Sequence, residues 1–147
     1  MPSFIDSDIE FITNLYKSFH DIVGGKNIPD FYQVIHPDAE IKFNNETYDC
    51  DECVSLMNDF CAATQSMEVT VVKPIECINE AERTYVALSS WAIESLSGSG
   101  KVDCPMLAII SIKDNKIIQA REVINMGGGL NRFLIDDITV KKEALAR

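Results

Sequence analysis

Glu122 is the residue of this 147-residue chain whose sequence neighbours best suit acid or base chemistry. It lies in a stretch rich in strand-forming residues, 117–126, where alternate side chains share a face. One face of that strand carries Ile118, Ala120, Glu122 and Ile124. Because this set is the more apolar, we expect it to face the interior. A desolvated carboxylate holds its proton more tightly, which makes Glu122 a candidate acid or base near neutral pH.

Two other interpretations of Glu122 stay open at this level. In one, its carboxyl is satisfied by a hydrogen bond to Tyr16 or another hydroxyl group. In the other, the register of the strand is displaced by one residue, and Glu122 is a surface acid that pairs with a lysine. A one-residue slip sends every side chain of a strand to the opposite face, so the two placements differ in burial.

Large aromatic, sulfur-containing and aliphatic side chains supply more bulky surface than a minimal core requires. In a small domain such residues either close the core or line a pocket for an apolar ligand. The candidate ligand-binding residues are Phe19, Phe31, Tyr32, Phe43, Met57, Phe60, Trp91, Met106 and Leu107. The alternative, in which all of them belong to the core, is equally compatible with the sequence.

The pattern Cys50-x-x-Cys53 is typical of half a zinc site or of a redox pair. A zinc site needs two further ligands, and the chain has no second pair of this spacing. The remaining candidates are Cys61, His20 and His36, none of which completes a ligand set. We therefore expect no metal and no other cofactor. The two cysteines are then core residues at the start of a helix, and the histidines are structural or solvated.

The first half of the chain is predicted to form a helical layer. Ser7 and Glu10 make a capping box for a helix over 7–24, which carries one apolar face. A short helix is expected after Pro29, and a third helix over 50–64.

The second half is predicted to be a sheet. A short strand over 39–43 precedes the third helix, and long strands rich in β-branched residues are expected at 68–78, 84–95, 102–112 and 117–126. Short turns between them favour antiparallel pairing. A helical layer followed by such a sheet predicts an α+β domain over 1–126, in which a curved, mainly antiparallel sheet wraps around three helices as a cone. No structure is predicted for the tail, 127–147.

Two short sequence motifs open the first and the last strand of the predicted sheet. Ile35-His36-Pro37-Asp38-Ala39 opens the first strand, and Asn115-Lys116-Ile117-Ile118-x-x-Arg121-Glu122 opens the last. In these two motifs and in the order of helices and strands, residues 7–126 resemble the nuclear transport factor 2-like superfamily. The similarity is to the branch of polyketide-cyclase-like (SnoaL-like) proteins, ketosteroid isomerases and limonene epoxide hydrolases. It implies the cone fold and a hydrophobic pocket.

The resemblance also shows which catalytic residues of the family are missing. Ketosteroid isomerases carry a base aspartate where this chain has Phe43 and a protonated aspartic acid where it has Leu107. Tyr16 resembles their hydrogen-bonding tyrosine on the first helix. Limonene epoxide hydrolases have a carboxylate after an arginine on the last strand, which Arg121-Glu122 resembles, but residues 89–92 do not supply the rest of their triad. Neither steroid isomerisation nor epoxide hydrolysis is therefore predicted.

The charge balance excludes several classes of partner. The chain has 23 acidic and 13 basic residues, and its formal net charge is -10. Residues 1–80 carry 15 of the acids and 4 of the bases, and no basic patch stands out in the remainder. We therefore expect neither nucleic-acid nor membrane binding. No signal peptide or long apolar run is visible, and five cysteines are an odd number, so we expect a cytoplasmic protein.

The sequence thus favours a protein that binds a small apolar molecule, as an isomerase, cyclase or hydrolase with Glu122 as acid or base. The resemblance adds Tyr16 to this candidate site. The alternative is a non-catalytic, dimeric protein-interaction module that has lost the catalytic residues of the family. The missing aspartates favour the module, whereas the apolar side chains and Glu122 favour the ligand-binding protein.

A homodimer is expected in either case. The long strands carry apolar residues on both alternating sets, such as Val86 and Leu88 against Trp91 and Ile93. A sheet with one face in water would alternate more cleanly. Members of the resembled family commonly pair through the outer face of this sheet.

Overall fold

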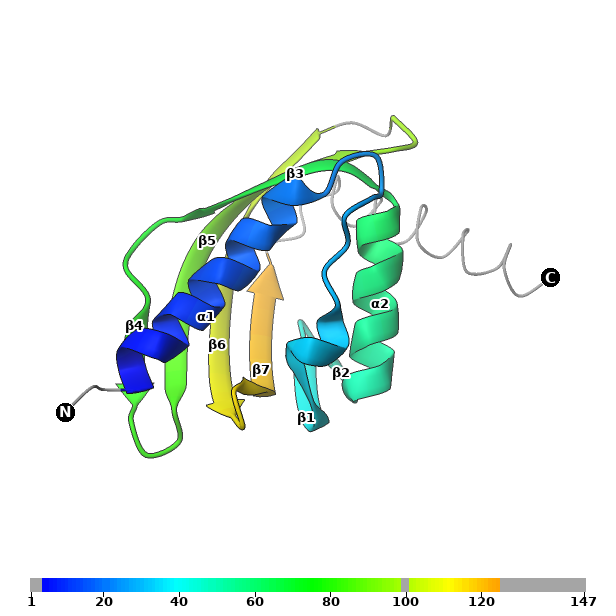
Figure 1. Cartoon of the computed structure of the whole chain (residues 1–147). Helices are drawn as coiled ribbons and strands as arrows, with labels where there is room; N and C mark the ends of the chain where they lie inside the picture. The colour runs from blue at the N-terminus through cyan, green and yellow to red at the C-terminus, as the bar shows by residue number, and fades with distance from the viewer. Residues whose placement is uncertain (1–3, 99–100, 125–147) are drawn as a thin grey trace.

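The structure is a computed structural model that describes residues 4–98 and 101–124. Two helices lie across the concave face of one curved sheet (Figure 1). The helices are α1 (Phe4–Ser18) and α2 (Cys50–Ala62), with single 3-10 turns η1 (Phe19–Asp21) and η2 (Phe31–Gln33). The strands are β1 (Ile35–Phe43), β2 (Glu46–Tyr48), β3 (Thr64–Val71), β4 (Glu76–Asn79), β5 (Thr84–Ser95), β6 (Lys101–Lys113) and β7 (Lys116–Ile124).

The sheet runs in the order β2-β1-β7-β6-β5-β3, and β4 pairs with β5 beside β3. Its strand pairs are antiparallel except for β1 with β7, which are parallel. This confirms the predicted α+β class with a curved, mainly antiparallel sheet. The parallel pair was not predicted, because it joins strands that are far apart in the sequence.

Helix α1 packs on the sheet through residues spaced by about one turn, Ile12 and Tyr16, and the chain continues this stripe into η1 with Phe19. The predicted start of the helix is wrong. The helix already includes Phe4, and the Ser7 hydroxyl donates to the Phe4 carbonyl oxygen at 3.1 Å, so Ser7 lies inside the helix rather than capping it.

Helix α2 begins with a capping box. The Asp49 carboxylate accepts a hydrogen bond from the Glu52 backbone N–H at 2.8 Å, and the Glu52 carboxylate accepts one from the Asp49 N–H at 3.1 Å. The short helix expected after Pro29 is reduced to η2. The chain leaves the helical conformation there because Ile35 pairs with Ile117 and begins β1 four residues before the predicted start.

The predicted strand over 68–78 is divided into β3 and β4. The break falls at Lys73-Pro74, where proline has no N–H to give to a sheet. The strand over 84–95 has the predicted bounds, and its two successors differ from prediction by one or two residues at their described ends. The tail over 127–147 lies outside the described residues.

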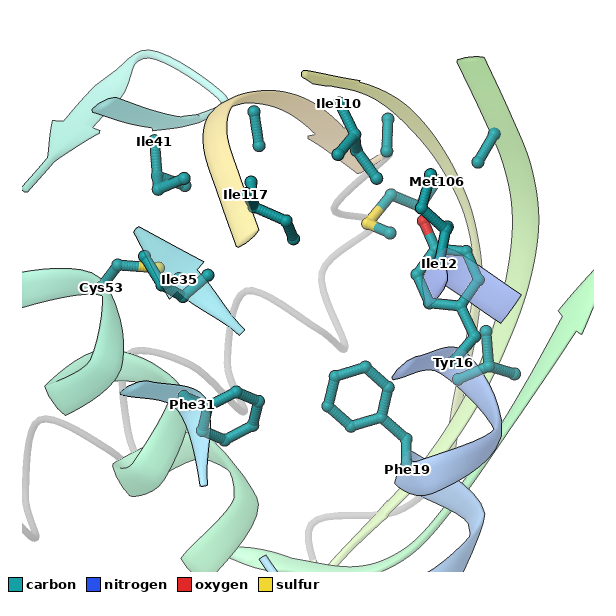
Figure 2. Close-up of a cluster of buried hydrophobic side chains, with 14 of the residues drawn as sticks. Ile12, Tyr16, Phe19, Phe31, Ile35, Ile41, Cys53, Met106, Ile110 and Ile117 are labelled. Carbon is teal, nitrogen blue, oxygen red and sulfur yellow. The ribbon is translucent and has the colours of Figure 1, made fainter. Parts of the chain in front are cut away.

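The core lies between the helices and the concave face of the sheet, which we call the interior face. Alternate residues of β5 and β6 point into it, including Tyr85, Trp91, Met106 and Ile110, all nearly inaccessible to solvent. Figure 2 shows side chains from α1, α2, β1, β6 and β7 directed toward one another in this layer. None of the described helices is both long enough and apolar enough to cross a membrane.

The opposite face of the sheet also carries apolar side chains. Leu88 of β5 pairs with Leu107 of β6, which in turn pairs with Val123 of β7, and all three are exposed. Val86 and Ile109 form the next pair of the same face and are partly buried. We call these five residues the outer patch.

A buried charge cluster fixes the start of α1 to the start of β5. Asp8 is 3% exposed, and its carboxylate accepts hydrogen bonds from Arg83 Nε at 2.9 Å and from the Tyr85 hydroxyl at 2.5 Å. The guanidinium of Arg83 also lies over the ring of Phe4. A buried carboxylate with this set of donors is stable only while the partners stay in place.

We predict that Asp8→Ala destabilises the fold, because it leaves Tyr85 and Arg83 without their acceptor. Urea unfolding should show a loss of about 3 kcal/mol, at the lower end of the range for a broken buried pair because Arg83 is partly exposed. The control is Glu10→Ala, an exposed acid on the same helix, which should change stability by less than about 0.5 kcal/mol. Equal effects of the two substitutions would contradict this account.

Candidate functional site

Strand pairing sets the position of Glu122. In β7 it pairs with Ala108 of β6 and with Phe43 of β1, and its carbonyl oxygen accepts a hydrogen bond from the Asn44 N–H at 2.8 Å. Directly paired residues project to the same side of a sheet, and Ala108 is fully buried on the interior face. The Glu122 side chain therefore points into the interior, toward the helices.

The carboxyl of Glu122 is surrounded mainly by protein. The residue keeps some accessible surface, but burial raises the pKa of the carboxyl from 4.5 to about 7. Desolvation has this effect because it penalises the charged form. At neutral pH the group is thus close to half ionised, which is the condition in which one carboxyl can both accept and return a proton.

Tyr16 of α1 reaches the same region. It is 4% exposed, and its hydroxyl is the one buried side-chain nitrogen or oxygen in the described residues that has no hydrogen-bond partner. Burial, and secondarily the charge of Glu122, raise the pKa of this hydroxyl, so it remains a proton donor. The hydrogen bond between Tyr16 and Glu122 that the sequence left open is therefore absent. An orphaned buried hydroxyl requires an explanation, and a bound acceptor is one.

Four aromatic rings, contributed by α1, β5, η1 and η2, lie in contact with one another in the interior. The Trp91 ring meets Tyr16 edge-on at 6.0 Å between centroids and lies 5.2 Å from Phe19, which is 6.1 Å from Phe31. Trp91 Nε1 donates to the Ser89 hydroxyl at 2.8 Å, which fixes the indole. Figure 2 shows Phe19 and Phe31 facing each other across the interior, with Tyr16 next to Phe19.

Cys53 of α2 is the third proton-bearing group near Glu122. Burial raises the pKa of its thiol to about 12, with smaller contributions from the charges of Glu122 and Cys50. Sequence reasoning assigned Cys53 to the core, and nothing local could have paired it with Glu122, because α2 and β7 meet only through the tertiary fold. The five cysteines are free thiols, and the described residues contain no cluster of three or more metal-binding side chains.

The two histidines have structural roles. His36 Nδ1 accepts a hydrogen bond from the Asp38 N–H at 3.0 Å, and its Nε2 lies 3.1 Å from a carboxylate oxygen of Asp114 in the β6–β7 turn. His20 Nε2 lies 3.0 Å from the backbone nitrogen of Val69 and links η1 to β3. These contacts hold strands and turns together, away from Glu122.

Most of the nine candidate ligand-binding residues lie inside. Five are buried and two are partly buried: Phe19, Phe31, Phe60, Trp91 and Met106, and then Phe43 and Met57. Two do not belong to the interior. Tyr32 is 51% exposed, and its hydroxyl donates to Asp51 at 3.0 Å on the surface. Leu107 is in the outer patch, because adjacent residues of a strand point to opposite faces and Met106 faces inward.

No family model and no curated protein matches the sequence of this chain. Solved structures do match. AclR of Streptomyces galilaeus, a proposed hydroxylase, has a TM-score of 0.71 at 13% identity over 88% of this chain and 96% of its own. A proposed SnoaL-like polyketide cyclase from Jannaschia sp. CCS1 has a TM-score of 0.61 at 14% identity, covering 86% and 90%. An NTF2-like protein from Exiguobacterium sp. 255-15 has a TM-score of 0.64 at 13% identity, covering 80% and 99%.

The chain has the nuclear transport factor 2-like fold. At these identities the matches establish the fold and leave the chemistry to the side chains. The resemblance predicted that Phe43 stands where ketosteroid isomerases carry their base. Glu122 is the neighbour of Phe43 on the next strand and points to the same side.

The raised pKa of Glu122 has a consequence for stability. In the unfolded chain the carboxyl has a pKa near 4.5, so between about pH 4.5 and 7 the folded protein binds more protons than the unfolded protein. The contribution of Glu122 to the free energy of unfolding therefore falls as the pH rises through this window. At about 1.4 kcal/mol per pKa unit, the full decrease is about 3 kcal/mol.

We predict that Glu122→Gln removes this decrease, because an amide does not ionise. The free energy of unfolding of the variant minus that of the wild type should increase by up to about 3 kcal/mol between about pH 5 and pH 8. Urea unfolding of both proteins across this range measures it, and the subtraction cancels the other titrating groups. A difference that is constant with pH would show that Glu122 is not desolvated.

Proposed function

We propose that this NTF2-like protein binds a small apolar molecule in its interior and catalyses proton transfer on it, as an isomerase or a cyclase. Glu122 is the acid or base, and Tyr16 is the hydrogen-bond donor to the reacting molecule. The observation that carries the proposal is the placement of a carboxyl with a pKa of about 7 near a buried hydroxyl that has no protein partner. Aromatic side chains next to Tyr16 suit an apolar ligand.

The two groups suit proton abstraction from a carbon next to a carbonyl. The Glu122 carboxylate would take the proton, and the Tyr16 hydroxyl would donate a hydrogen bond to the oxygen on which negative charge develops. Return of the proton to a different carbon gives an isomer. Alternatively, the enolate carbon attacks a second carbonyl and closes a ring, and the proton passes from Glu122 to the alkoxide oxygen formed there. The names of two structural neighbours, a proposed hydroxylase and a proposed polyketide cyclase, support chemistry on small organic molecules.

Exchange of carbon-bound hydrogen tests the proposal without knowledge of the natural substrate. 2-Tetralone, an uncharged bicyclic ketone, is incubated with the protein in D₂O, and loss of its α-proton signal is followed by NMR. We expect faster exchange than in buffer. Glu122→Gln should lower the protein-dependent rate by about 100-fold or more, and Tyr16→Phe by about 100-fold, as is usual for a general base and for an oxyanion donor.

The matched control is Tyr32→Phe, which removes the same hydroxyl from an exposed tyrosine and should leave the exchange rate unchanged. Binding of 2-tetralone without acceleration of exchange would favour the non-catalytic alternative. Equal rates for the wild type and Glu122→Gln would refute the role of the carboxyl.

We also propose that the protein forms a homodimer through the outer patch. Three of its residues, Leu88, Leu107 and Val123, are exposed in one row across three neighbouring strands. A contiguous apolar surface of this kind is more typical of an interface than of a surface in water. The proposal concerns assembly and is independent of the chemistry at Glu122.

Light scattering after size-exclusion chromatography should give about twice the 16.4 kDa chain mass at micromolar concentration. We predict that Leu107→Glu shifts the protein to monomer, because it places a charge at the centre of the outer patch. Ile78→Glu, at an exposed apolar residue of β4 outside the patch, should leave the dimer intact. A monomeric wild type would end this proposal.

A further inference from the structure

We infer that Glu122 makes the interior selective for uncharged ligands and excludes carboxylates and other anions. The selectivity follows from the kinds of ionisable group that meet there. It rests on the proposed function, because it states which class of small apolar molecule that site accepts.

Among residues 4–98 and 101–124, the ionisable groups that interact with the Glu122 carboxyl are acids. Tyr16 approaches from α1 and Cys53 from α2, and both are buried. The residues paired with Glu122 on either side, Phe43 of β1 and Ala108 of β6, are not ionisable. Its neighbour on β7, Arg121, is exposed and points to the outer face.

Within the described residues, two basic side chains that are partly or fully buried are engaged elsewhere. Arg83 is bound to Asp8 at the start of β5. His36 lies at the opposite end of β1 from Phe43 and contacts Asp114. Neither can neutralise an anionic ligand beside Glu122.

Two negative charges in a poorly solvated space repel each other strongly, since little water is present to screen them. An anion can therefore enter only when Glu122 carries its proton. An uncharged ligand with a carbonyl or amide oxygen meets no such barrier, and its oxygen can accept the hydrogen bond that the Tyr16 hydroxyl leaves unused. The interior thus favours a neutral molecule that bears a hydrogen-bond acceptor.

The size of the effect follows from the protonated fraction of Glu122. With a pKa of about 7, the carboxyl is roughly nine-tenths protonated at pH 6 and one-tenth protonated at pH 8. Tyr16 and Cys53 stay protonated throughout this range, because burial raises both pKa values. The apparent Kd of an anion should therefore increase about tenfold between pH 6 and pH 8, whereas that of a neutral ligand should not change.

Adamantane-1-carboxamide and adamantane-1-carboxylate form a matched pair of probes, because they share one apolar skeleton and differ in charge. Isothermal titration calorimetry of the full chain at about pH 6 and pH 8 gives the four Kd values. We expect the carboxylate to lose about tenfold in affinity at the higher pH and the carboxamide to be unaffected. In Glu122→Gln the carboxylate should bind equally at both pH values, whereas Glu10→Gln, at an exposed acid, should behave as the wild type.

Three results would overturn the inference, and they separate it from the proposed function. Carboxylate binding that does not change with pH in the wild type, or that weakens equally in Glu122→Gln, means that Glu122 does not select for charge. Ligand binding itself would then still stand. If neither probe binds at either pH, the proposed binding of apolar molecules fails, and the selectivity fails with it.

Discussion

The parallel pairing of β1 with β7 unites the two parts of the sheet and sets the surroundings of Glu122. It joins the first strand of the chain to the last described one, and thereby places the β1–β2 hairpin beside β6 and β5 in one continuous sheet. The register changes between Ile35 and Glu40, where His36 bonds to the Asp38 backbone and to Asp114. Beyond this irregularity the pairing is regular and ends with Phe43 opposite Glu122. The position of the candidate acid is thus set by a long-range contact.

Two buried acids in this fold differ in how they are accommodated. Asp8 has the Arg83 guanidinium and the Tyr85 hydroxyl as donors, so its burial stabilises the junction of α1 with β5. Glu122 lies near groups that are themselves acids, and burial raises its pKa toward neutrality. A native fold retains such a destabilising arrangement more readily where it serves a function. The contrast between the two carboxyls is therefore itself an argument that Glu122 belongs to a functional site.

The Glu122 carboxyl lies in an apolar and aromatic environment. Trp91 and Phe19 form close ring contacts beside Tyr16, and the bond from Trp91 to Ser89 holds the indole in one orientation. Low polarity strengthens the electrostatic effects on which both the proposed proton transfer and the proposed charge selection depend. The two proposals share one physical origin, which is the removal of water from around Glu122.

Local periodicity was enough to predict several elements and the faces that they bury. Alternation along 117–126 favoured an inward Glu122, and helical spacing favoured an inward Tyr16, because burial patterns repeat with the period of the local structure. The alternation fails at the start of the strand, where Ile117 is buried instead of Ile118 because the register of β6 with β7 shifts there. The turn at Asp114-Asn115, where both residues have positive φ, was equally visible. The same alternation puts Leu107 and Met106 on opposite faces of β6, so naming both as ligand-binding residues was inconsistent with it.

Which of these elements meet could not be predicted from local patterns. The parallel partner of β7, the approach of Cys53 to Glu122 and the unpartnered Tyr16 hydroxyl all depend on contacts between residues distant in the sequence. The exposure of Tyr32 depends on η2, a single turn whose length was set by where β1 begins to pair. Local patterns carry no information about such pairings, because the energy that selects them comes from burial and strand registration across the whole domain.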